Sequence, residues 1–316
     1  MNAAPQPARG CAAWLAAAGL AGSALVWGLS WWPVRHLQQL GVQPLWTTAL
    51  VYAPGALLVL LARPRALRGL LRHPSLLLVA LGAGGANVCF NLGVATGDVV
   101  RVVLLFYLMP VWATLLARWL LGERIGPGAL LRLVLALGGA LVVLWPRAGG
   151  WPLPRQAADW LGLCGGMFFA LNNVMLRRCA EVDAAARALA MFAGGLACGA
   201  LLALLLQALG EAPGLPRPQA AWLLPALALG LALCAGGLGL QYGAARLPAT
   251  LTAVIMMLEI VFASLSSAWL GAGRLGPRVF AGIVLIGAGV VLGARAEAAH
   301  NDAGEAETLS SAPRNS

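Results

Sequence analysis

Charged residues are scarce in this chain: they make up 10% of its 316 residues, whereas 60% are apolar. A soluble domain of this size is about one-quarter charged, so the chain has too little charge to cover a water-exposed surface. It is also far too apolar for a disordered protein. The remaining class is an integral membrane protein that crosses the bilayer several times.

Lysine is absent, and histidine and cysteine are few. All 21 basic residues are arginines that lie between apolar runs, so we interpret them as topology signals and expect no nucleic-acid partner. The three histidines and six cysteines show no metal-ligand or disulfide-framework spacing. We therefore expect no metal, no cofactor and, since no Ser-His or paired-carboxylate arrangement emerges, no catalytic residues.

Ten runs are long and apolar enough to cross a bilayer, which takes roughly 20 residues each. With both termini in the cytoplasm, 14 arginines fall on the inner side and 7 on the outer side, as the positive-inside rule favours. We thus predict a multi-pass protein of the cytoplasmic (inner) membrane. The predicted spans are 11–33, 44–62, 74–95, 98–121, 127–146, 158–178, 186–209, 219–244, 248–270 and 277–295.

Two stretches of the chain resemble each other at a constant offset of 150 residues. Residues 91–143 and 241–293 share 14 identities in 53 ungapped positions, including Trp119 with Trp269 and Pro127 with Pro277. Five spans per copy is an odd number, so the second copy enters the membrane from the opposite side. Inverted repeats of this kind are common in secondary transporters, with the substrate site near the midplane.

The fold class that follows is an all-α integral membrane protein with ten transmembrane helices arranged as two inverted five-helix repeats. We place the first repeat at 1–146, a Pro/Gly-rich linker at 147–157 and the second repeat at 158–295. Residues 296–316 are small, polar and acidic, and we expect them to form a disordered cytoplasmic tail.

Short motifs in both copies are similar to those of the EamA-type family of the drug/metabolite transporter (DMT) superfamily. The resemblance covers about 285 residues, and its motifs keep the family's order. It implies a ten-helix carrier, often an exporter of amino acids or other small metabolites, usually in the bacterial inner membrane. The matching residues are Trp27-Gly28, Tyr107-Leu108-Met109-Pro110-Val111, Leu121-Gly122-Glu123-Arg124, Tyr242-Gly243-Ala244-Ala245-Arg246-Leu247-Pro248-Ala249 and Leu258-Glu259.

The sequence departs from the family pattern at three places. Because of these departures, the resemblance indicates the family but does not indicate which substrate this chain carries. Val51 stands where the family often has arginine, and Ile260 replaces the proline of the second Leu-Glu-Pro motif. The usual Gly-Glu pair of the second copy reads Ala272-Gly273.

Glu259 is the most distinctive polar residue, because it lies about 11 residues into a 23-residue apolar run, near the bilayer midplane. A charge there is costly and must face protein or water. A carboxyl group at this depth suits proton coupling or the binding of a cationic amine. The alternative is a protonated carboxyl group that joins two helices.

Other polar and aromatic residues in the predicted spans are further candidates for binding the substrate. Side-chain amides offer paired donors and acceptors, but they also join helices at roughly 1 kcal/mol or less each, and both interpretations stay open. Aromatic rings at depth suit an organic substrate. The candidates are Asn87, Asn91, Asn172, Asn173, Gln241, Trp27 and Tyr107.

Five residues are candidates for gating or for structural roles. Asp98 and Arg101 are spaced for a same-face pair, which forms either a local salt bridge or a gate. Glu123 and Arg124 end a predicted span on the inner side. Pro110 removes a backbone hydrogen bond in mid-helix and should kink it.

Taken together, these features predict a secondary active transporter that exports small organic metabolites such as amino acids or amines. It would work by alternating access, and proton coupling is one way in which the transport could be energised. The alternatives are a non-transporting scaffold or channel and, least favoured, an integral membrane enzyme. The expected partners are a small-molecule substrate and the lipid bilayer, with the chain a monomer or a homodimer.

Overall fold

The computed structural model describes residues 10–97, 99–123, 125–145, 154–270 and 276–310. Within these ranges the chain is all helical, without a strand. The helices are α1 (Gly10–Gln39), α2 (Pro44–Ala62), α3 (Arg65–Arg72), α4 (Ser75–Thr96), α5 (Val99–Phe106), α6 (Met109–Leu121), α7 (Pro127–Leu144), α8 (Ala157–Arg178), α9 (Ala184–Ala208), α10 (Ala220–Ala244), α11 (Ala249–Met256), α12 (Leu258–Trp269) and α13 (Pro277–Ser310).

Eight of the described segments are long and apolar enough to cross a membrane. Two of these, Arg101–Leu121 and Ala249–Trp269, each consist of two shorter helices, α5 with α6 and α11 with α12. The described apolar part of α13, Pro277–Leu292, is shorter, and α8 carries Asp159, Arg177 and Arg178 in its terminal turns. The chain is therefore a multi-pass membrane protein.

The helices begin and end where local chemistry requires it. Pro44, Pro127 and Pro277 stand in the first turns of α2, α7 and α13, where a missing N–H costs nothing. The Asp183 side chain accepts a hydrogen bond from the N–H of Ala186 and so caps α9. Gly122 ends α6 in the left-handed region, at φ 69°, which glycine adopts without steric cost.

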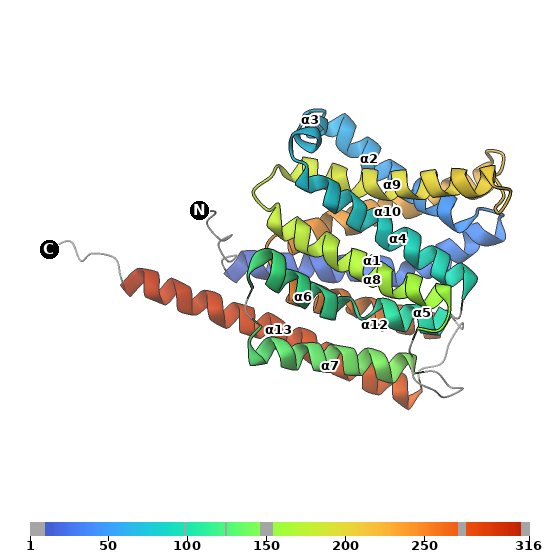
Figure 1. Cartoon of the computed structure of the whole chain (residues 1–316). Coiled ribbons are helices and arrows are strands. Elements are labelled where there is room, and N and C mark those ends of the chain that lie inside the picture. Colours follow the sequence, from blue (N-terminus) through green and yellow to red (C-terminus); the bar gives the residue numbers. More distant parts are fainter. Residues whose placement is uncertain (1–9, 98, 124, 146–153, 271–275, 311–316) are drawn as a thin grey trace.

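The long helices run side by side in one bundle, with α7 and α13 together along one edge (Figure 1). The other large helix contacts pair α4 with α8, α1 with α10, and α2 with α9. Each of these pairs takes one helix from the N-terminal half and one from the C-terminal half. The bundle is therefore built across the two halves, and its core lies between them.

The beginning of α1 and the end of α13 lie at the same end of the bundle (Figure 1). The short helix α3 lies at this end too, packed against α9 (Figure 1). Ala66 is buried in that contact, whereas Leu67, Leu71 and the arginines of α3 are exposed. Such an amphipathic helix suits the interface between lipid and water.

Helix α13 is longer than the predicted span, because it continues to Ser310 and extends beyond the rest of the bundle (Figure 1). The composition of residues 296–316 predicts a disordered tail. The structure differs as far as Ser310, because a segment rich in alanine and glutamate has a high helix propensity. The expected linker, 147–157, lies mostly outside the described residues, and α8 begins at Ala157.

Candidate functional site

A cavity lies in the middle of the bundle, between helices of both halves. Its volume is about 60 Å³ counted over the centres of water-sized molecules, which is room for several waters. The lining comes from α1, α2, α4, α5, α8, α9, α10 and α12. The lining residues are Trp27, Tyr52, Ala83, Ala86, Asn87, Phe90, Phe106, Phe169, Asn172, Met191, Leu240 and Glu259.

Glu259 reaches this cavity because the spanning segment breaks just before it. Helix α11 ends at Met256, Met257 forms a tight turn, and Glu259 stands in the first turn of α12. Its carboxyl group lies beside the side chain of Tyr107, which comes from the corresponding break between α5 and α6. The two breaks, one from each half, therefore meet at the side of the cavity.

Pro110 stands in the first turn of α6, just after the break of the first half. Proline has no N–H to donate, so the carbonyl oxygen of Phe106, four residues earlier, lacks its usual helical partner. Gly166 of α8 lies against this oxygen, so closely that a Cβ atom there would clash with it. The break in α5–α6 is thus packed against a helix of the other half.

Asn87 is held in place by two neighbours. Its Nδ2 donates to the hydroxyl of Tyr52 at 2.7 Å and to the carbonyl oxygen of Ala83 at 3.0 Å. Both amide hydrogens are thereby used, so the capacity that remains in this side chain is the acceptor Oδ1.

Trp27 and Asn172 also line the cavity, one from each half. Within the described part of the chain, Nε1 of Trp27 and Oδ1 of Asn172 have no hydrogen-bond partner although both atoms are buried. Buried polar atoms are normally paired. These two atoms are therefore candidates for hydrogen bonds to a ligand in the cavity.

The structure places the remaining predicted amides elsewhere. Asn91 donates to the hydroxyl of Thr48, and Gln241 donates to the carbonyl oxygen of Ala184 at 2.6 Å, so both join neighbouring helices. Asn173 is fully buried and is not among the lining residues. The spacing of Asn87 and Asn91 gave them one helix face, but of the two only Asn87 is among the lining residues.

Sequence reasoning missed Tyr52 and most of the apolar lining. The aromatic rings of Phe90, Phe106 and Phe169 pack on one another, with centroid distances of 5.0 Å and 5.9 Å to Phe106. Tyr52 carried a signal, since the chain has only three tyrosines and a phenol inside an apolar span needs a partner. The phenylalanines carried none, because they look like ordinary lipid-facing or core residues.

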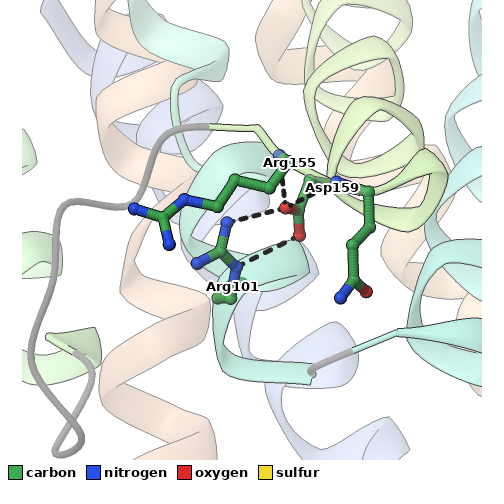
Figure 2. Close-up of polar contacts among 4 residues, drawn as sticks. Arg101, Arg155 and Asp159 are labelled. Atoms are coloured by element: carbon green, nitrogen blue, oxygen red, sulfur yellow. Dashed lines mark hydrogen bonds and ion pairs between the residues drawn. The ribbon is translucent and has the colours of Figure 1, made fainter.

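Helix α5 lies at the end of the bundle opposite the beginning of α1 (Figure 1). Arg101 of α5 forms an ion pair. Its guanidinium donates to both carboxylate oxygens of Asp159, at 3.3 Å from Nε and 2.7 Å from Nη2 (Figure 2). Asp159 also accepts from the backbone N–H groups of Arg155 and Gln156 and thereby caps α8. The pair joins α5 of one half to α8 of the other; Asp98 lies outside the described residues.

A second ion pair holds the other end of α8. Arg177 donates from Nε to the carboxylate of Glu123, just beyond the end of α6, at 3.0 Å. Arg178 donates to the carbonyl oxygen of Leu120 at 3.1 Å. Arg124 lies outside the described residues. Helix α8 is therefore tied to α5 and α6 at both of its ends.

The sequence matches the model of the EamA-like transporter family twice, over residues 14–145 and 156–294. The two matches cover one half of the bundle each and together most of the chain. The chain belongs to the EamA-like transporter family. This EamA protein is thus a membrane transporter of the DMT type, from a family of transporters and not of enzymes.

A solved structure described as "Crystal structure of protein" has the same fold as this EamA protein. The two agree with a TM-score of 0.72 at 22% sequence identity, over 90% of this chain and 96% of the other. At this identity the likeness concerns the fold alone. No curated protein matches the chain.

Proposed function

We propose that this EamA protein is a secondary carrier that exports small organic metabolites, such as amino acids or amines, by alternating access. The observation that carries the proposal is the central cavity, which combines one carboxylate, two amides and aromatic walls between the two halves of the bundle. Small-molecule sites have this composition: mostly apolar, with a few polar groups that orient the ligand.

Ten spans in two inverted five-helix repeats supply the mechanical basis. Two parts of the helix plan recur at an offset of 150 residues: α5 (Val99–Phe106) with α11 (Ala249–Met256), and the beginnings of α7 and α13 at Pro127 and Pro277. The helix contacts are also repeated: α4 of the first half packs on α8, and α10, which corresponds to α4, packs on α1, which corresponds to α8. Such repeats make inward-open and outward-open forms similar in energy, with the site at their interface.

Glu259 carries the proton or the positive charge of the substrate in this mechanism. It lines the cavity, and the neighbouring Tyr107 comes from the other half. A carboxyl group that exchanges a proton or a cation at this place changes the contact between the two halves. This is the kind of local change that biases a two-state transition.

The ion pair of Arg101 with Asp159 closes the cavity on the outer side. In this proposal the protein lies in the inner membrane, and both of its termini are on the cytoplasmic side. The arginines of α3 support this orientation, because they lie at the same end of the bundle as the beginning of α1 (Figure 1).

The decisive experiment measures solute flux in proteoliposomes. A panel of amino acids and amines is presented to the purified protein, with and without an imposed pH gradient. A secondary carrier accumulates at least one solute against its gradient, and an uncoupler abolishes this accumulation. Flux that only equilibrates concentrations identifies a channel, and absence of flux for the whole panel contradicts the proposal in favour of a scaffold.

A further inference from the structure

We infer that the substrate is a primary ammonium ion with an apolar or aromatic body and without a carboxylate. This inference rests on the proposed function and narrows it from amino acids or amines to one chemical class. It comes from a count of the hydrogen-bonding and charged groups that line the cavity.

The polar groups that remain available are mostly acceptors. They are the carboxylate of Glu259, Oδ1 of Asn87, whose amide hydrogens are already used, and the unpartnered Oδ1 of Asn172. A carboxylate accepts at about four positions, so Glu259 keeps capacity for a ligand although Tyr107 lies beside it. A primary ammonium group carries three N–H donors, one for each of these three acceptors. The acceptors come from α12, α4 and α8, respectively.

The lining offers little to a carboxylate. Of the described residues that line the cavity, none is an arginine, lysine or histidine, and Glu259 supplies a negative charge. A zwitterion would bring its own carboxylate into an apolar space beside that charge. An unpaired charge in such a space is strongly disfavoured, so the free amine should bind and its amino acid analogue should not.

The walls of the cavity fit an apolar body on the ammonium group. Trp27, Tyr52, Phe90, Phe106 and Phe169 supply aromatic rings, and Met191 adds a flexible apolar side chain. Aromatic faces attract cations and also pack on rings and alkyl chains. Two donors also belong to the lining: the unpartnered Nε1 of Trp27, and the hydroxyl hydrogen of Tyr52, whose oxygen accepts from Asn87. They can donate to a neutral acceptor on the ligand, such as a hydroxyl group.

Equilibrium binding to the purified wild-type protein tests the inference with three related probes. They are 2-phenylethylamine, its N,N,N-trimethyl derivative and phenylalanine, compared by competition against radiolabelled 2-phenylethylamine. We expect the primary amine to bind at least about tenfold more tightly than either analogue, as lost hydrogen bonds to charged groups predict. Equal or tighter binding of phenylalanine, equal binding of the trimethyl compound, or no binding of the amine overturns it.

A matched pair of variants assigns the effect to the cavity. Asn172→Leu removes a lining acceptor, whereas Asn173→Leu makes the same change one residue along, at a side chain that is not among the lining residues. We expect Asn172→Leu to weaken the binding of 2-phenylethylamine about tenfold and to leave the binding of the trimethyl compound unchanged. Equal weakening of both compounds contradicts the hydrogen-bonding role of Asn172. If either variant fails to fold, the comparison of the three probes on the wild-type protein still tests the inferred substrate class.

The outcomes separate this inference from the proposed function. Concentrative flux of phenylalanine without flux of 2-phenylethylamine refutes the inferred substrate class but is consistent with the proposed carrier function. Absence of flux for every solute in the panel refutes the carrier itself.

Discussion

Arg101 and Asp159 face each other across the junction of the two halves, with 2.7 Å between Nη2 and Oδ2 (Figure 2). The carboxylate of Asp159 is 2% exposed and the arginine 22%, so the pair is largely screened from water. The same carboxylate caps α8. One residue therefore fixes both the start of a helix and its attachment to the other half.

Replacing Asp159 by alanine should destabilise the fold substantially. The change removes the carboxylate that pairs with the Arg101 guanidinium across the two halves and also removes a cap of α8, which together should cost about 2–4 kcal/mol. The measurement is the free energy of unfolding of the purified protein in detergent. Asp183→Ala is the control, because Asp183 caps α9 through the N–H of Ala186; it should cost only about 1 kcal/mol. Equal losses would show that the ion pair adds nothing.

Glu259→Gln should abolish transport and leave folding intact. Glutamine keeps the shape and the hydrogen-bonding capacity toward Tyr107 but cannot take up a proton or bind a cation by charge. The measurement is initial flux in proteoliposomes at equal protein content. Glu123→Gln is the matched control: Glu123 pairs with Arg177 beyond the end of α6, away from the cavity, so flux should persist. Wild-type flux in Glu259→Gln would remove the role assigned to this residue.

Two adjacent glycines of α7 should respond in opposite ways to alanine. A Cβ at Gly139 would lie 2.7 Å from Cγ1 of Ile286 and 2.8 Å from the carbonyl oxygen of Gly282, both in α13. A Cβ at Gly138 meets nothing within 4 Å. We expect Gly139→Ala to cost about 1–3 kcal/mol by forcing α7 and α13 apart. Gly138→Ala should be neutral or stabilising by up to about 1 kcal/mol, and unfolding titrations compare the two.

Topology gives a test that is independent of the substrate. Reporter fusions after His73 and at the C-terminus should both be active on the cytoplasmic side, because α3 and the end of α13 lie at one end of the bundle (Figure 1). A reporter inserted at Gly41, between α1 and α2, should lie outside. A C-terminal reporter on the side opposite His73 would contradict the even number of crossings that the proposed function requires.

Composition and motifs were enough to identify the class of protein and the family, and hydropathy located eight segments that the structure also shows as long apolar helices. Span boundaries followed from hydropathy, because a bilayer demands long apolar helices whatever their neighbours are. The offset of 150 residues pointed to related halves, and the breaks before Pro110 and Glu259 fall at corresponding places in them. The sequence also predicts the depth of Glu259, since counting residues along a span gives the expected position across the bilayer.

Only the tertiary structure decided which polar residues share a site. Asn87, Asn172 and Glu259 come together from α4, α8 and α12, whereas Asn91 and Gln241 join neighbouring helices. Asp159 was found as the partner of Arg101 because α8 packs on α5, a contact that has no local sequence signal. The reason is geometric: hydropathy fixes where a residue lies along the membrane normal, but the rotation of each helix and its neighbours are set by packing.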